Sequence, residues 1–464
     1  MSKTNIPARH PAGRRAAIIA TVCAVVLLAL LVTWALALQS GFFLRHNTVI
    51  RCGEEKIDTA MFAVYYKENL LILTEGAEGY DPATPADRQP YADGKTWHDH
   101  VREVTEQDAT RMVVFAAAAG AEGQDTAAAR VLAEEYMDAF EAAARTQRIS
   151  ADAYAAARYG KGVRETDVAR AAGLYARASL RAAALAEKTY TAAEREAAYT
   201  ANAADFALAD YIAYPVKVDL DGIADPDAMR EAYIRAEARA KRIAVAQDED
   251  AFIAAVQADM AGVAPALSAA DIRRKTAALY HYLVPAGDTD IAVKWATAPI
   301  RAVGDTAVLG ATGDYTVVFC LAPADRRTDK PAEAWQIMIS YADHATRADA
   351  YAAATDRLSR LAGVDGFAVD PLATYLPAAY YGTVEKPIAD WLTADRTAGD
   401  TAVIEAQDGY AILCYAAPSP FAVWEWQAIH ALQEAEYTAM QATYPVTLRS
   451  GVTLPQAALT VSSQ

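Results

Sequence analysis

The chain has 464 residues, an apolar fraction of 54% and a formal net charge of −16. This length predicts roughly three domains with sizeable cores, and the acidic balance excludes a nucleic-acid-binding protein, because phosphate binding needs a basic face. The four cysteines and seven histidines are scattered, so neither a disulfide framework nor a metal site is predicted.

The N-terminal segment begins with basic residues and continues without a charge. Residues 1–15 carry no acidic side chain, and residues 16–38 carry no charge at all. A helix of that length covers roughly 34 Å, enough to cross a hydrocarbon core. The pattern predicts a cytoplasmic tail at 1–15, one transmembrane helix from Ala16 to Leu38 and a chain mostly outside the cytoplasm at the cell membrane. A cleaved signal peptide stays open, because Ala35-Leu36-Ala37 suits a signal peptidase.

The next region, residues 47–205, reads as mostly helical after a short opening strand. Val49 to Cys52 has the pattern of a strand, and Asp58 is a good N-cap for the helix that follows it. From Trp97 to about Lys188 the pattern is helical with few breaks. Thr191 and Glu194 then form a capping box that opens one more helix.

Two stretches of the C-terminal half repeat one another. Gly304 to Pro323 reads GDTAVLGATGDYTVVFCLAP, and Gly399 to Pro418 reads GDTAVIEAQDGYAILCYAAP. Each has the form of a β-hairpin, with an apolar run, a Gly/Asp turn and a second apolar run. A tryptophan precedes each copy, Trp295 and Trp391. We infer a duplicated domain.

The two copies differ in length before their hairpins. The first would open with a strand around 208–218 and carry an insertion from Pro265 to Pro285, and the second would open with a strand at 335–341. Both have helices between the opening strand and the hairpin. After Pro420, residues 423–443 read as one amphipathic helix.

The order of these elements resembles that of SurA-like and PrsA-like foldases, in which a helical chaperone domain precedes parvulin-type peptidyl-prolyl isomerase domains. The opening strand, the helix with Tyr65 and Tyr66, the run from Tyr159 to Val163 and the two repeats carry the resemblance. It implies an α+β fold: one N-terminal transmembrane helix, a mostly helical SurA-like domain, two parvulin-like α/β domains with small antiparallel sheets, and a C-terminal helix returning to the N-terminal domain. The implied domains are 47–205, 206–325, 330–420 and 421–464.

The return of the C-terminal segment to the N-terminal domain leads to one specific prediction, a pairing of two strands. Val446 to Leu448 could form a closing strand, and we expect it to pair with Val49 to Cys52. Strands further than about 10 Å apart would exclude this pairing, because paired strands lie about 5 Å apart.

Parvulins resemble one another most at two histidines that face each other across the sheet. The matching positions here hold Gln336 in the opening strand and Ala411 in the closing strand of the second copy, and Thr316 in the first copy. The resemblance therefore implies that the scaffold is kept and the catalytic site is lost. We predict no catalytic residue, no cofactor and no metal.

The resulting interpretation is a membrane-anchored extracytoplasmic folding factor that binds unfolded or secreted polypeptides and does not catalyse prolyl isomerisation. Aromatic side chains are the candidates for client binding, with ordinary core packing as the competing explanation for each. They are Tyr65, Tyr66, Trp97, Tyr380, Tyr381 and Trp391. An active prolyl isomerase with a non-histidine pocket and a non-catalytic cell-envelope scaffold stay open as alternatives, as do a homodimer and the identity of the client.

Overall fold

The structure is a computed structural model of the chain, and it describes residues 41–461 except 78, 124–125, 221–222, 287–288, 312 and 450. The chain divides into two compact units. Unit 1 contains the residues up to Thr189 together with those from Gln433 onward, and unit 2 runs from Tyr190 to Leu432. The domain boundaries given by the sequence stay predictions.

Unit 1 consists of helices and one small sheet. Its elements are α2 (Phe42–His46), β1 (Thr48–Cys52), β2 (Glu55–Asp58), α3 (Thr59–Thr74), a 3-10 turn (Ala86–Arg88), α4 (Trp97–Ala121), α5 (Thr126–Thr146), α6 (Ala151–Tyr159), α7 (Glu165–Ala186), β11 (Val446–Leu448) and a second 3-10 turn (Gln456–Leu459). Helix α3 begins where predicted, because the Asp58 carboxylate accepts a hydrogen bond of 3.1 Å from the N–H of Met61.

The sheet of unit 1 joins the two distant parts of the chain. Its strand order is β11-β1-β2, with Ile50 opposite Leu448 and Cys52 opposite Val446 in an antiparallel pair. The predicted pairing of the C-terminal strand with the opening strand is therefore confirmed. Further on, the Lys67 ammonium on α3 donates to the carbonyls of Ala457 and Thr460, which holds the C-terminal segment against the same helix.

Unit 2 contains two sheets with their covering helices. Its elements are α8 (Ala192–Ala201), α9 (Ala203–Phe206), β3 (Leu208–Lys217), α10 (Pro226–Ile243), α11 (Glu249–Val263), α12 (Ala269–Ala277), β4 (Tyr280–Pro285), α13 (Ile291–Ala296), β5 (Thr306–Ala311), β6 (Asp314–Asp325), β7 (Ala332–Ser340), a 3-10 turn (Tyr341–Asp343), α14 (Arg347–Ser359), α15 (Gly363–Ala368), β8 (Thr374–Ala379), α16 (Lys386–Thr393), β9 (Thr401–Glu405), β10 (Gly409–Pro418) and α17 (Val423–Thr443), which continues into unit 1.

The two sheets of unit 2 have the same topology and register. Their strand orders are β4-β3-β6-β5 and β8-β7-β10-β9, antiparallel throughout. In the closing hairpins Thr306 lies opposite Phe319, and Thr401 lies opposite Cys414. These are corresponding positions of the sequence repeat. The repeat inferred from the sequence therefore forms two sheets with the same strand order and register. We call them the first and second copies.

The residues that the two copies share build the turn before each hairpin. The Asp305 carboxylate accepts the N–H of Ala302, and the Asp400 carboxylate accepts the N–H of Thr397, both at 2.9 Å. The glycine before each aspartate has a positive φ, 88° at Gly304 and 92° at Gly399, a conformation that side-chain-bearing residues rarely adopt.

An arginine from the same turn lies over the tryptophan of each copy. The Arg301 guanidinium lies 4.7 Å from the Trp295 ring centre, and the Arg396 guanidinium lies 4.6 Å from that of Trp391. Each arginine also donates to the backbone carbonyl of its tryptophan, at 3.0 and 2.9 Å respectively. The tryptophans shared by the two copies therefore stabilise the local structure in each.

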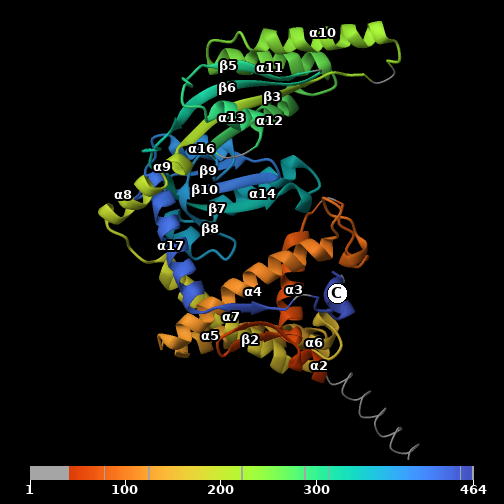
Figure 1. Cartoon of the computed structure of the whole chain (residues 1–464), viewed down its shortest axis with the longest axis vertical. Helices are drawn as coiled ribbons and strands as arrows, with labels where there is room; N and C mark the ends of the chain where they lie inside the picture. The colour runs from red at the N-terminus through yellow and green to blue at the C-terminus, as the bar shows by residue number, and fades with distance from the viewer. Residues whose placement is uncertain are drawn as a thin grey trace, which may run out of the picture. The chain divides into compact units, whose positions relative to one another are not determined.

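Each sheet has helices on both of its faces. In the first copy, α10 and α11 lie along one side of the sheet and α13 lies on the other (Figure 1). The first face buries Phe252 against Phe319, and the second buries Trp295 near Cys320. In the second copy, Phe367 packs on one face, and the residues of α16 pack on the other.

The fold class predicted from the sequence is corrected here. None of the helices between residues 41 and 461 that the structure describes is long and apolar enough to cross a membrane, and the predicted helix from Ala16 to Leu38 lies outside the described residues. The longest described helix of unit 1, α4, has 25 residues but carries many charged side chains. The structure shows a mixed α+β protein with small antiparallel sheets.

Candidate functional site

The positions that correspond to the parvulin histidines lie within the sheets of unit 2. Gln336 on β7 is half-buried, and its amide nitrogen lies 2.8 Å from the Met338 sulfur. Ala411 on β10 is fully buried and lies opposite Met338, so it shares a face with Gln336. Thr316 on β6 lies between Pro215 and Leu309 of the neighbouring strands. None of these side chains can titrate near neutral pH, and the absence of catalytic residues at them stays a prediction.

The aromatic candidates of unit 1 lie in or near its core. Tyr66 is fully buried, with its hydroxyl 3.0 Å from the His98 Nδ1. Trp97 is buried against the rings of Tyr80 and Tyr91. Tyr65 is half-buried and donates from its hydroxyl to the carbonyl of Ala171 at 2.7 Å. All three residues thus make packing or hydrogen-bond contacts within unit 1, and client binding by them stays a prediction.

The aromatic candidates of the second copy separate into two places. Tyr380 and Tyr381 follow β8, and the Tyr381 ring stacks on Tyr282 of the first copy with ring centres 4.7 Å apart. Trp391 lies on α16, half-buried beneath Arg396. Only the tyrosine pair therefore comes near the cavity described next.

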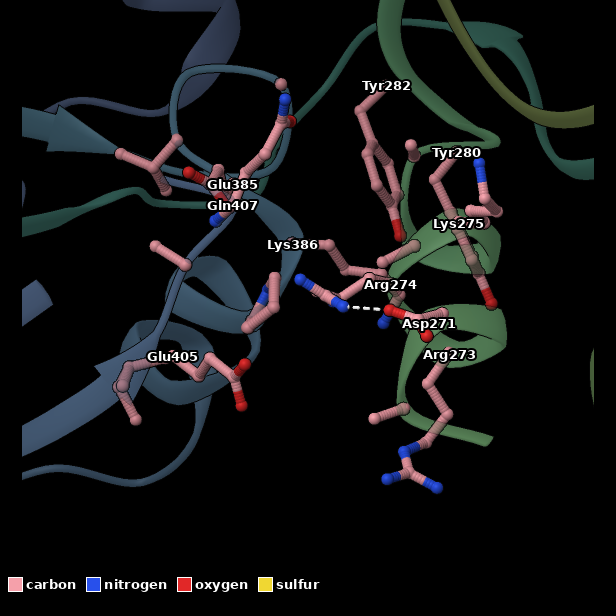
Figure 2. Close-up of a pocket in the computed structure, with 18 of the residues that line it drawn as sticks. Asp271, Arg273, Arg274, Lys275, Tyr280, Tyr282, Glu385, Lys386, Glu405 and Gln407 are labelled. Atoms are coloured by element: carbon pink, nitrogen blue, oxygen red, sulfur yellow. Dashed lines mark hydrogen bonds and ion pairs between the residues drawn. The ribbon is translucent and has the colours of Figure 1, made fainter. Parts of the chain in front are cut away.

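Unit 2 contains a cavity of about 910 Å³ between its two copies, which we call the inter-repeat groove. One wall comes from α12 and β4, and the other comes from the start of α16 and the β9–β10 hairpin (Figure 2). Its lining residues are Leu267, Ala270, Asp271, Arg273, Arg274, Lys275, Ala277, Ala278, Tyr280, Tyr282, Gly382, Val384, Glu385, Lys386, Pro387, Val403, Ile404, Glu405, Ala406 and Gln407.

Two tyrosines from β4 line the first wall. Figure 2 shows Tyr280 and Tyr282 projecting side by side, and their ring centres are 5.7 Å apart with nearly parallel planes. The Tyr280 hydroxyl donates to the Glu249 carboxylate at 2.7 Å. Burial, followed by the hydrogen bond to Glu249, raises the pKa of Tyr280, and burial also raises the pKa of Tyr282. Both phenols therefore stay neutral at physiological pH.

Helix α12 supplies the charged part of the same wall. Ser268 and Asp271 form a capping box at its start, and the Asp271 carboxylate also accepts from Arg274. Hydrogen bonds from Ser268 hold the pKa of Asp271 below its ordinary value. The neighbouring Arg273 and Lys275 are exposed, and neither has an ion-pair partner in the part of the chain that the structure describes.

The second wall holds charges that are already engaged by other groups, two of them in ion pairs. The Lys386 ammonium lies 4.9 Å from the Tyr280 ring centre and 2.8 Å from the Asp390 carboxylate. The Glu385 carboxylate accepts the N–H of Gln407 at 2.7 Å, which ties α16 to the hairpin turn. Glu405 is likewise engaged, because Arg347 donates to it at 2.8 Å.

The lining of the groove suits binding, through its tyrosine, aliphatic and charged side chains. Its lining residues include no serine, threonine, cysteine or histidine, and its three acids each accept a hydrogen bond. The lining therefore holds no Ser–His or Cys–His pair of the kind that activates a nucleophile. Among residues 41–461 as described, no cluster of His, Cys, Asp and Glu side chains could hold a metal ion.

Reasoning from the sequence missed most of this site. The stretch from Pro265 to Pro285 was recognised only as an insertion, yet it supplies α12 and the tyrosines of β4. The alternating Tyr280, His281 and Tyr282 is a usable signal, because side chains two apart on a strand share a face. The partner wall could not be inferred, since it depends on how the two copies pack.

Comparisons with known proteins give little further guidance. No family model matches the chain, and no curated protein matches it. Among solved structures, it is similar to the 3.10 Å crystal structure of a foldase protein, PrsA, from Lactococcus lactis. That likeness has 15% sequence identity and a TM-score of 0.16, and it covers 61% of this chain and 80% of the other. At this TM-score the likeness carries no argument about function.

Proposed function

We propose that the protein is a folding factor that holds segments of unfolded polypeptides in the inter-repeat groove and does not isomerise them. The observation that carries this proposal is the lining of the groove, which combines tyrosine and aliphatic side chains with charges and has no serine, cysteine or histidine. The extracytoplasmic location is part of the proposal and rests on the N-terminal sequence alone.

The chemistry of the groove suits a ligand that varies in sequence. Unfolded chains expose apolar side chains, and tyrosines bury large areas at a small cost in conformational entropy. Tyr280 and Tyr282 present neutral rings. The Tyr280 hydroxyl donates to Glu249 and can still accept a hydrogen bond, and the Tyr282 hydroxyl can accept or donate one. Such contacts bind many peptides with low affinity and little sequence specificity. A protein that holds unfolded chains of varied sequence requires this kind of binding.

The test uses the purified full-length chain and a chemically unfolded client that aggregates on dilution. We expect the wild-type chain to suppress light scattering, and Tyr282→Ala to lose this effect several-fold. Tyr351→Ala is the matched control, because Tyr351 is 51% exposed on α14 and does not line the groove. No suppression by the wild-type chain, or equal losses in both variants, would overturn the proposal.

A prolyl-peptide turnover assay on the same preparation decides the remaining question of catalysis. We expect no turnover above the uncatalysed rate. Turnover that Gln336→Ala abolishes would instead establish an isomerase with a non-histidine pocket. Inactivity in both assays would point to a scaffold that binds one fixed partner.

A further inference from the structure

We infer that the inter-repeat groove binds its client as an added β-strand on the outer edge of β9, and that it favours extended segments carrying a carboxylate. This inference rests on the proposed function, and it names the binding mode and the class of ligand. It depends on two features of the groove, an unpaired strand edge and two cations without ion-pair partners among the described residues.

The first feature is the outer edge of β9. This strand is last in its sheet and pairs only with β10. The N–H of Ala406 bonds to the carbonyl of Gly409, and antiparallel pairing alternates, so Ile404 and Ala402 also direct their backbone groups toward β10. The N–H and C=O groups of Thr401, Val403 and Glu405 therefore face outward.

That edge borders the groove and has no other strand beside it. Val403 and Glu405 both line the cavity, and no backbone partner beyond β10 pairs with them among the described residues. An unpaired edge is a ready template for an extended peptide, whose backbone supplies affinity without regard to sequence. Tyr280 and Tyr282 on the opposite wall would then contact the side chains of the added strand.

The second feature is the charge of the rim. Arg274 is paired with Asp271, Lys386 with Asp390, and Glu405 with Arg347. Arg273 and Lys275 on α12 are exposed and have no such partner in the described part of the chain. These two cations outnumber Glu385, the lining carboxylate that accepts only the N–H of Gln407. The rim therefore keeps a net positive charge beside an open strand edge. It attracts a carboxylate, and the attraction depends on salt.

The first copy provides an internal control for the edge. Val308 on β5 corresponds to Val403, because Val308 lies opposite Val317 as Val403 lies opposite Ile412. Its backbone also faces outward by the same alternation, but Val308 does not line the groove. Proline is tolerated on an edge strand where its missing N–H faced outward, so the same substitution can be made in both copies.

The experiment measures binding of a fluorescein-labelled ten-residue peptide of alternating valine and serine with two aspartates to the full-length chain. We expect Val403→Pro to weaken binding roughly three- to tenfold, the effect of losing a backbone hydrogen bond, and Val308→Pro to leave it unchanged. The same peptide with alternate amides N-methylated should bind the wild-type chain more weakly. This second measurement needs no variant, so it holds even if Val403→Pro fails to fold.

The carboxylate preference has its own comparison. Arg273→Glu combined with Lys275→Glu should weaken the aspartate peptide several-fold and leave its asparagine analogue nearly unaffected. Lys330→Glu is the control, because Lys330 is exposed and lies outside the groove. Equal binding of the two peptides to the wild-type chain would overturn the preference.

The outcomes separate this inference from the proposed function. Equal binding by Val403→Pro and Val308→Pro, or full binding of the N-methylated peptide, would refute strand addition. If the wild-type chain then still suppressed client aggregation, holding of clients would stand by another mode. If it suppressed none, the proposed function itself would fail.

Discussion

The two copies in unit 2 share their sheet register and differ in what surrounds it. The Gly-Asp turn and the arginine over a tryptophan occur in both, with nearly identical distances. These are the residues that make the repeat visible in the sequence. The comparison teaches that the two copies share the residues that stabilise the fold.

The differences between the copies coincide with the groove. Helix α12 exists only in the first copy, where it supplies Arg273 and Lys275, whereas β9 of the second copy supplies the edge that the groove exposes. The two walls thus come from non-equivalent parts of equivalent folds.

The largest effect is expected from replacing the two core phenylalanines, one in each copy. Phe252 and Phe367 are both fully buried, so replacing either by alanine should cost roughly 3–5 kcal/mol of local stability. Phe252→Ala should cost about 0.5–1.5 kcal/mol more, because its ring meets Phe319 at 5.2 Å, whereas Cys414 occupies the corresponding place in the second copy. Native-state hydrogen exchange of β6 and β10 measures each copy separately. Equal losses in the two copies would contradict the extra aromatic contribution.

A smaller effect is expected from an ion pair in the first copy. Arg239 on α10 donates to Asp259 on α11 at 2.7 Å, and Tyr214 donates to the same carboxylate at 2.9 Å. Burial raises the pKa of Asp259, but these hydrogen bonds outweigh it and hold the pKa below its ordinary value. Asp259→Asn should therefore cost about 2 kcal/mol at neutral pH.

The pH dependence of that loss has a definite sign. A depressed carboxyl pKa stabilises the folded state above the unfolded-state value near 3.8, and the contribution disappears as pH falls through the folded value. Acid unfolding monitored by exchange in β3 should show wild type and Asp259→Asn converging below about pH 4. A constant gap down to pH 2 would rule out the ion pair as its source.

The smallest expected effect tests the equivalence of the turns. Asp305→Ala and Asp400→Ala each remove one hydrogen bond to a backbone N–H, at the same distance in both copies. Each should cost about 1 kcal/mol, and the two losses should agree within about 0.5 kcal/mol. Amide hydrogen-exchange rates in the hairpin after each turn measure the loss caused by each variant. Unequal losses would mean that the surroundings decide what the turn contributes.

The parts of the fold that follow from local rules could be predicted from the sequence. Asp58 as a cap and the repeated hairpins follow from turn chemistry and periodicity. The pairing of Val446–Leu448 with β1 follows from no local rule, and it was expected from the resemblance to SurA-like proteins. The groove could not be predicted, because Val403 and Tyr282 become neighbours only through packing of one copy on the other. Tyr66 and Trp97 are buried in the core, although the sequence made them candidates for a binding surface. Composition alone does not separate a core aromatic residue from a surface one.

The pairing of β11 with β1 also means that the sheet of unit 1 can form only late in synthesis of the chain. Ile50 leaves the ribosome long before its partner Leu448 exists. At about 5–20 residues per second the delay is roughly 20–80 s, during which β1 offers one open edge to any neighbouring nascent chain. Unit 2 is continuous in sequence and faces no such wait. Translation speed, and early termination near the C-terminus, should therefore affect the solubility of unit 1 far more than that of unit 2.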